Sequence, residues 1–281
     1  MKDYLENKID PAANVHVSDE LPFWSAPFGI ELLEAIEYRN GITALDVGFG
    51  TGFPLIELAM RLGEESTVYG IDPWEPAVAR TRQKIGILGI KNIRIIQGMA
   101  EELPLEDASV DLIVSNNGLN NVSDLDRVLV ECGRVIRSGG QFVITVNLDR
   151  TMIEFYKEFA RVLSDMKMQR ELERMQEHIR AKRRPLKEIL SKLEANGFSI
   201  KDLKKKQFNY HFASGTAMLN HFFIRMDFLD SWVGILPEEK VEMVFEKMEE
   251  RLNGLACRLG SLQLSVPYVL INARKLQEQI H

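Results

Sequence analysis

The chain has 281 residues, of which 45% are hydrophobic and 27% charged, and its formal net charge is −6. This length and apolar content suffice for one large domain with a substantial core. The acidic balance argues against a general nucleic-acid binder, because such affinity depends on cationic contacts with phosphates. No run approaches the roughly 18 apolar residues that span a bilayer, and the first residues lack the apolar stretch of a signal peptide. We therefore expect a cytoplasmic protein.

Cysteine usage excludes two further classes. The two cysteines, Cys132 and Cys257, are too few and too far apart for a disulfide framework or a cysteine-based metal site. We predict no metal centre.

The first half of the chain alternates short β-rich runs with helical patterns. Residues 1–41 hold an aromatic segment around Trp24 and apolar residues at helical spacing, and a hydrophobic strand follows them. Further strands are predicted at 67–71, 92–97, 110–115 and 141–147. This alternation is typical of a parallel sheet built from β/α units, so the pattern predicts an α/β fold.

The second half departs from that alternation. The spacing predicts an amphipathic helix from Met152 that continues towards Arg184, then a helix from Pro185 and a sixth strand over 198–212. An insertion over 214–262 holds two further helices, the first carrying Leu219 through Met226. A final strand over 266–273 should begin at Pro267, because proline cannot donate inside a ladder.

The most informative segment is the glycine-rich turn after the first strand. Asp46 is followed by glycines at positions 48, 50 and 52, and a second strand ends at Asp72 about twenty residues on. A glycine turn followed by such an acid is typical of a site for a nucleotide's ribose. A pyrophosphate requires G-x-G-x-x-G, whereas here Phe53 stands at the third glycine position. The spacing therefore favours S-adenosylmethionine over NAD.

These residues resemble the first two motifs of the class I S-adenosylmethionine-dependent methyltransferases. The resemblance implies a Rossmann-like, doubly wound sheet of seven strands, in the order 3-2-1-4-5-7-6 with the last strand antiparallel, and a helical lid. It also implies that Asp46, Gly48, Gly50, Thr51 and Gly52 line the methionine side of the donor. Asp72 would hold the ribose, with Pro73 and Trp74 beside it. The segment 131–140 makes the core most similar to the branch that contains the ubiquinone and menaquinone biosynthesis enzymes.

The same resemblance suggests how the chain is organised. We expect a single methyltransferase domain over 1–281, with an N-terminal segment at 1–41 and a cofactor-binding core at 42–150. Helical lid insertions would occupy 151–184 and 214–262, and 185–213 with 263–281 would complete the sheet.

Three further segments extend the expected donor site. The sequence Gln97 to Pro104 resembles the family's adenine-binding segment and places Met99, Ala100 and Glu101 there, although Met99 replaces the usual aspartate. Asn116, after the fourth strand, would contact the methionine moiety. Trp24 would close over the donor.

The acceptor site is less clearly marked. Candidate acceptor-binding residues are Asn117, Asn120, Tyr156, His221 and Arg225. Methyl transfer from a sulfonium mainly requires positioning of donor and acceptor and exclusion of water, so no triad is needed. A base could come from His178, His211 or His221, and the sequence assigns none.

The apolar and aromatic residues of the insertions favour a hydrophobic or aromatic small-molecule acceptor. Two alternatives stay open. One is a non-catalytic protein that binds S-adenosylmethionine and forms a homodimer through its helical insertions; the other is a nicotinamide-dependent oxidoreductase.

Overall fold

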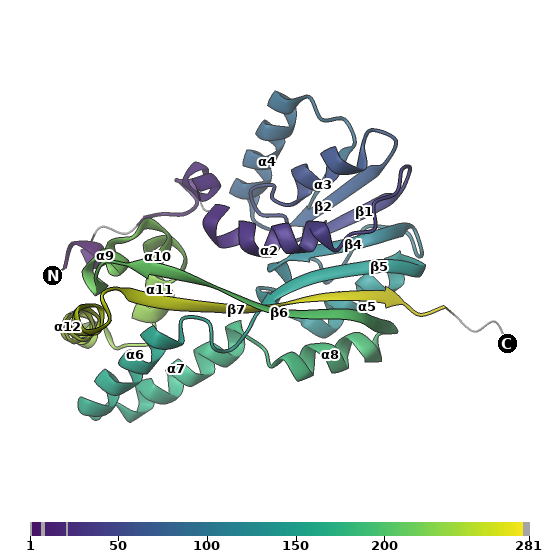
Figure 1. Ribbon diagram of the computed structural model, residues 1–281. Helices are drawn as coiled ribbons and strands as arrows, with labels where there is room; N and C mark the ends of the chain where they lie inside the picture. The colour runs from purple at the N-terminus through teal and green to yellow at the C-terminus, as the bar shows by residue number, and fades with distance from the viewer. Residues whose placement is uncertain (1, 7–8, 21, 278–281) are drawn as a thin grey trace. The chain divides into compact units, whose positions relative to one another are not determined.

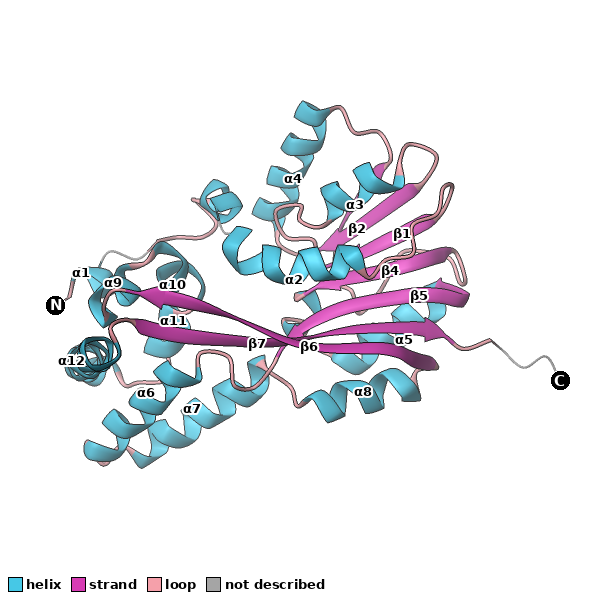
Figure 2. Ribbon diagram, viewed as in Figure 1, coloured by secondary structure: helices cyan, strands magenta, loops and turns pink. Residues whose placement is uncertain are grey.

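A computed structural model describes residues 2–6, 9–20 and 22–277. Within these residues no helix is both long and apolar enough to cross a membrane. Figures 1 and 2 show the elements, whose bounds are α1 Asp3–Glu6, η1 Val15–Glu20, α2 Pro22–Glu34, β1 Thr43–Val47, α3 Leu55–Leu62, β2 Thr67–Asp72, α4 Glu75–Leu88, β3 Ile93–Gln97, β4 Val110–Asn116, η2 Gly118–Asn120, α5 Leu125–Val135, β5 Ile136–Asn147, α6 Ile153–Asp165, α7 Gln169–Lys182, α8 Leu186–Ala195, β6 Phe198–Phe212, α9 Gly215–Asn220, α10 Phe222–Asp227, α11 Leu229–Val233, η3 Glu238–Lys240, α12 Val241–Leu259 and β7 Leu262–Lys275.

The strands form a seven-stranded sheet in the order β3-β2-β1-β4-β5-β7-β6. Strands β1 to β5 pair in parallel, and β7 pairs antiparallel to β5 with Tyr268 opposite Asn147. The predicted fold class, strand order and strand direction are confirmed.

Chain direction explains the helix layers beside this sheet. The order runs from β1 outwards to β3, then returns to β4 on the other side of β1. Because β-helix-β connections are right-handed, this reversal places α3 and α4 on one face and α5 on the other. Figure 2 shows α2 on the side of α3 and α4, and α8 with α5. The carboxyl ends of β1 and β4 meet at the reversal, where ligands bind in open α/β sheets.

The described chain divides into two compact units. The sheet unit contains Val15–Asn147, Arg184–Lys206 and the chain from Tyr268 onwards. The helical unit contains Leu148–Arg183 and Gln207–Pro267, together with the N-terminal residues through Asn14. The core of the sheet unit includes the fully buried Ala44, Val114 and Val143 on neighbouring strands, against which helices pack Leu32 and Leu55.

Two predicted helices are interrupted. The helix expected from Met152 to Arg184 is two helices, α6 and α7, because Lys167 adopts a left-handed conformation (φ 58°) and Met168 N donates to Leu163 O at 2.9 Å. This is a common way for a helix to end. The helix expected to carry Leu219 through Met226 is also divided, since His221 between α9 and α10 has extended backbone.

The last strand also differs from the prediction. It spans Leu262–Lys275, so Pro267 lies inside the strand rather than at its start. Pairing with β5 begins at the next residue, Tyr268, and Pro267 contributes only its carbonyl oxygen, which accepts from Leu148 N at 3.0 Å. The proline is tolerated because it precedes the ladder with β5 and needs no N–H there.

Candidate active site

A cavity of about 390 Å³ opens in the sheet unit at the carboxyl ends of β1, β2, β3 and β4. Its wall combines backbone-rich turns after each strand with two residues of α2. The lining residues are Trp24, Ser25, Val47, Gly48, Gly50, Ile71, Asp72, Pro73, Trp74, Gly98, Met99, Ala100, Glu101, Asn116, Asn117, Gly118, Asn121 and Val122. Four strand ends thus contribute to one site, as the topology predicts.

Asp72 ties the glycine-rich turn to the end of β2. Its Oδ2 accepts from Gly50 N and its Oδ1 from Trp74 N, both at 2.9 Å. Burial raises the pKa of Asp72, and the two N–H bonds oppose that rise. A carboxylate has about four lone-pair sites, so each oxygen keeps acceptor capacity for hydroxyl groups in the cavity.

The turn itself depends on close backbone approach. Gly48 has φ 78°, and a Cβ there would lie 2.8 Å from Gly118 Cα. The turns after β1 and β4 are therefore in direct contact, and this contact forms the floor of the cavity. Thr51 and Gly52 follow in the same turn but are not among the lining residues; a Cβ on Gly52 would lie 2.9 Å from the Ile56 side chain.

Asp46 lies beneath this floor. The side chain is fully buried, and neither oxygen makes a hydrogen bond of normal geometry among the described residues. Burial, and after it the neighbouring carboxylate of Asp72, raise the pKa of Asp46 well above its usual range. Asp46 is not among the residues that line the cavity, so any influence on a ligand passes through the turn that follows it.

We expect Asp46→Asn to stabilise the ligand-free protein at pH 7. Because the folded-state pKa lies above the unfolded one, the wild type loses stability as pH rises above about 4, the unfolded value. Asparagine has nearly the same shape and no charge to bury. Thermal denaturation should show a melting temperature higher by about 2–4 °C, typical of about 1 kcal/mol, with the difference shrinking towards pH 4. A difference that does not change with pH would contradict the assigned pKa.

The turn after β3 forms another wall. Met99 is 45% exposed, Ala100 is buried, and Glu101 Oε1 accepts from Ser123 N at 3.0 Å and from Asp124 N at 3.1 Å. Glu101 therefore joins this turn to the start of α5. Asp124 caps that helix by accepting from Arg127 N.

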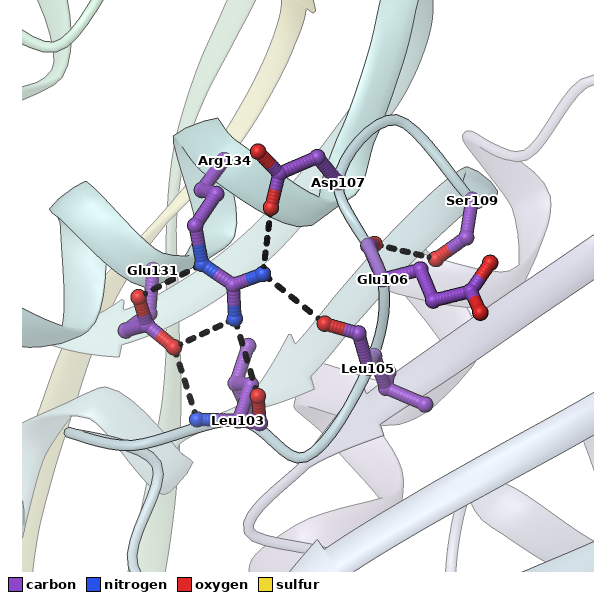
Figure 3. Close-up of polar contacts among 7 residues, drawn as sticks. All are labelled: Leu103, Leu105, Glu106, Asp107, Ser109, Glu131 and Arg134. Carbon is purple, nitrogen blue, oxygen red and sulfur yellow. Dashed lines mark hydrogen bonds and ion pairs between the residues drawn. The ribbon is translucent and has the colours of Figure 1, made fainter.

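Arg134 on α5 fixes the loop that continues from this turn (Figure 3). Its guanidinium donates to Leu103 O and Leu105 O, each at 2.8 Å, and to Asp107 Oδ1 at 2.7 Å. Glu131, one helical turn earlier, pairs with Arg134 and accepts from Leu103 N at 2.8 Å. This network restricts the loop that directly follows one wall of the cavity. The i, i+3 spacing of Glu131 and Arg134 indicates only a helix-surface pair, so the sequence did not reveal this role.

The segment that holds these residues matches a known family. Residues 45–144 match the sequence profile described as "Methyltransferase domain". This match agrees with the predicted resemblance to class I S-adenosylmethionine-dependent methyltransferases and with the predicted donor.

Curated relatives match over the same part of the chain. A demethylmenaquinone methyltransferase of Bacillus mycoides is 38% identical over 125 residues, which cover 44% of this chain and 53% of the relative. One from Bacillus cereus is 36% identical over the same length. The chain thus spans about half the length of the curated relatives it matches.

Solved structures share the fold over most of the chain. The YcgJ protein from Bacillus subtilis superposes with a TM-score of 0.58 and 19% identity, covering 90% of this chain and 99% of that one. A geranyl diphosphate methyltransferase in complex with SAM gives a TM-score of 0.58 and 16% identity, covering 97% of this chain and 94% of that one. These similarities show the class I methyltransferase fold.

The asparagines after β4 have different environments in the sheet unit. Asn116 lines the cavity, but its Nδ2 donates to Ser25 O at 3.1 Å and its Oδ1 accepts from Thr145 Oγ1 at 2.8 Å. Both polar ends of Asn116 thus connect β4, β5 and α2. Asn117, in a left-handed conformation (φ 62°), accepts from Asn120 Nδ2 at 2.9 Å; Asn117 lines the cavity and Asn120 does not.

Aromatic residues border the same cavity. Trp24 on α2 lines it and packs edge-on against Phe28, with ring centroids 5.5 Å apart. Pro73 and Trp74, directly after Asp72, also line it. Ser25 and Val122 are lining residues that the sequence did not suggest. The Ser25 carbonyl oxygen accepts a hydrogen bond from Asn116, which lies 91 positions away in the chain, and a contact of that kind leaves no local sequence signal.

Three predicted acceptor residues belong to the helical unit. Tyr156 on α6 is 2% exposed, and its hydroxyl accepts from Trp232 Nε1 at 3.1 Å and from Arg183 Nη1 at 3.3 Å. His221 and Arg225 lie at the start and on the body of α10, and burial lowers the pKa of His221. None of the three lines the cavity of the sheet unit.

Proposed function

We propose that the protein transfers a methyl group from S-adenosylmethionine to a small-molecule acceptor. The observation that carries this proposal is the position of Asp72, which fixes the glycine turn through Gly50 N and faces the cavity beside it. The family match over 45–144 supports the reaction class.

The residues present suit the donor. Asp72 keeps acceptor capacity for the ribose hydroxyls, and the close turns at Gly48 and Gly118 leave room for the methionine portion. Met99 and Ala100 would border the adenine, with Trp24, Trp74 and Asn116 around the remainder. S-adenosylmethionine supplies an electrophilic methyl group on a sulfonium sulfur. The protein's own contribution is to orient the two reactants and to exclude water from the cavity.

The acceptor is proposed to be hydrophobic or aromatic. In the helical unit the rings of Phe155 and Trp232 stack with centroids 3.8 Å apart, and Phe228 lies 5.5 Å from Trp232. Phe155 and Trp232 are fully buried, so these two rings pack in the interior of the helical unit. The curated relatives' names point to a quinone-type acceptor for those enzymes, which agrees with an acceptor of this chemistry. Asn117, Asn120, Tyr156, His221 and Arg225 remain candidate acceptor residues.

A location in the cytoplasm, the absence of a nucleic-acid partner and pairing of two copies through the helical segments remain predictions. A non-catalytic protein that binds S-adenosylmethionine is the second candidate function. It is favoured over the first if the donor binds but no methyl group is transferred to any of a panel of quinol, phenol and carboxylic-acid acceptors.

A thermal-shift comparison tests the donor assignment against the nicotinamide alternative. S-adenosylhomocysteine at about 100 times its Kd should stabilise the protein by about 2.7 kcal/mol, a rise of about 5 °C or more in melting temperature. NAD should leave the melting temperature unchanged. Stabilisation by NAD and not by S-adenosylhomocysteine would refute the proposed function.

A further inference from the structure

The first turns of α2 form one wall of the donor cavity, and they depend on contacts with the sheet. Trp24 and Ser25, in these turns, line the cavity. Pro27 lies inside the helix and has no N–H, so one of the helical hydrogen bonds that would stabilise these turns is missing. A side chain of β7 supplies one replacement contact, because the Tyr268 hydroxyl donates to Pro27 O at 3.2 Å.

The end of β4 supplies a second contact with α2. Asn116 Nδ2 donates to Ser25 O at 3.1 Å, directly beside the cavity. The helix comes very close to this region at Gly29, where an added Cβ would lie 2.2 Å from Phe53 Cε1 and 3.2 Å from Asn116 Nδ2. The position of α2 is therefore closely linked to the position of the Asn116 amide.

Thr145 on β5 fixes the orientation of that amide. Its hydroxyl donates to Asn116 Oδ1 at 2.8 Å, so the oxygen end of the amide faces β5 and the nitrogen end faces α2. An amide turned the other way would place its oxygen against the Ser25 carbonyl oxygen, and two acceptors cannot form a hydrogen bond. Thr145 is fully buried and does not line the cavity. Any effect of the Thr145 hydroxyl on a bound donor is therefore indirect.

We propose that Asn116 and Thr145 are positioning residues that hold α2, and with it Trp24, against the donor cavity. This inference rests on the proposed function, because it gives the pair a part in retaining the donor and excluding water. Asn116 is only 9% exposed, so its hydrogen bonds form away from bulk water, where loss of one partner is costly. Trp24 packs edge-on against the fully buried Phe28 of the same helix, so a displaced α2 carries both rings with it.

Hydrogen exchange of the ligand-free protein tests the pair without the donor. Thr145→Val removes the hydroxyl and keeps the shape of the side chain; it should raise exchange of the α2 amides about threefold or more. Exchange of the β1 amides should stay unchanged and serves as the internal reference. Thr145→Ser keeps the hydroxyl and should stay close to wild type. Thr67→Val makes the same change at a half-buried position at the start of β2, and this matched control should exchange as wild type does.

Titration with S-adenosylhomocysteine tests whether the pair acts through α2. Thr145→Val should weaken binding about threefold and Asn116→Leu about tenfold, as expected for loss of one and of two buried hydrogen bonds. Trp24→Ala should also weaken binding. Adding Thr145→Val to Trp24→Ala should weaken it little further, because the two changes disturb the same wall and their effects are then not additive.

Unchanged exchange of α2 in Thr145→Val would overturn the inference, and so would an equal rise in β1, which would indicate a general loss of stability. Fully additive losses of affinity in the double variant would overturn the action through Trp24. If wild type does not bind S-adenosylhomocysteine, the proposed function fails, and exchange of α2 still decides whether the pair holds the helix. If Thr145→Val does not fold, Asn116→Leu takes its place in both measurements.

Discussion

Asp72→Ala should weaken S-adenosylhomocysteine binding by about 100-fold or more. The change removes the acceptor for the ribose hydroxyls, and each lost hydrogen bond to a charged group is worth about 1.5–3 kcal/mol. It also frees Gly50 N and Trp74 N, which now donate to Asp72, so the turn loses its fixed geometry. Isothermal titration with S-adenosylhomocysteine measures the loss.

Asp111→Ala is the matched control. Asp111 Oδ2 accepts from Thr43 N at 2.9 Å, so this carboxylate also fixes the backbone of β1. Asp111 and Thr43 lie near the starts of β4 and β1, at the end of the sheet away from the cavity. Its loss should lower stability and leave affinity within about twofold of wild type. Similar loss of affinity in both variants would show that Asp72 acts only through stability.

Gly118→Ala should prevent binding and lower stability by about 1–3 kcal/mol, the usual cost of overpacking. An added Cβ would lie 2.3 Å from Val47 O and 2.7 Å from Ser115 Oγ, and the backbone of β1 must move to relieve the first contact. Val47 precedes the glycine turn, so that movement also alters the floor of the cavity. Chemical denaturation and titration with S-adenosylhomocysteine measure the two effects.

Gly86→Ala provides the contrast for this substitution. Gly86 lies inside α4, is exposed, and has nothing within 4 Å of an added Cβ. Alanine should stabilise the helix by about 0.5–1 kcal/mol and leave binding unchanged. If Gly118→Ala were as harmless as Gly86→Ala, the close contact between the turns after β1 and β4 would not be required.

The sequence signal for the donor site is local. The spacing of Asp46, Gly48 and Gly50, with Asp72 after the next strand, lies within one β-turn-α-β unit and directly indicates a ribose site. The resemblance then supplied the strand order, which periodicity cannot give. The end of α6 near Lys167 was not predicted. A single left-handed residue in a charged helical pattern leaves no compositional signal when it is neither proline nor glycine.

Other features could not be predicted from the sequence because they depend on contacts between segments that are far apart in the chain. Asn116 was expected to contact the donor; it lines the cavity, and its amide is joined to Ser25 and Thr145, from α2 and β5. Arg183 appeared in the sequence only as part of a basic run, which usually indicates a solvated face. Its burial against Tyr156 depends on how α6 and α7 pack, and single-sequence patterns do not report that packing.

A structure of the protein with S-adenosylhomocysteine tests the central claim most directly. We predict that both ribose hydroxyls lie within hydrogen-bond distance of Asp72, with the adenine against Met99 and Ala100 and the homocysteine portion beside Gly48 and Asn116. A ligand bound outside this cavity, or with its ribose away from Asp72, would contradict the account.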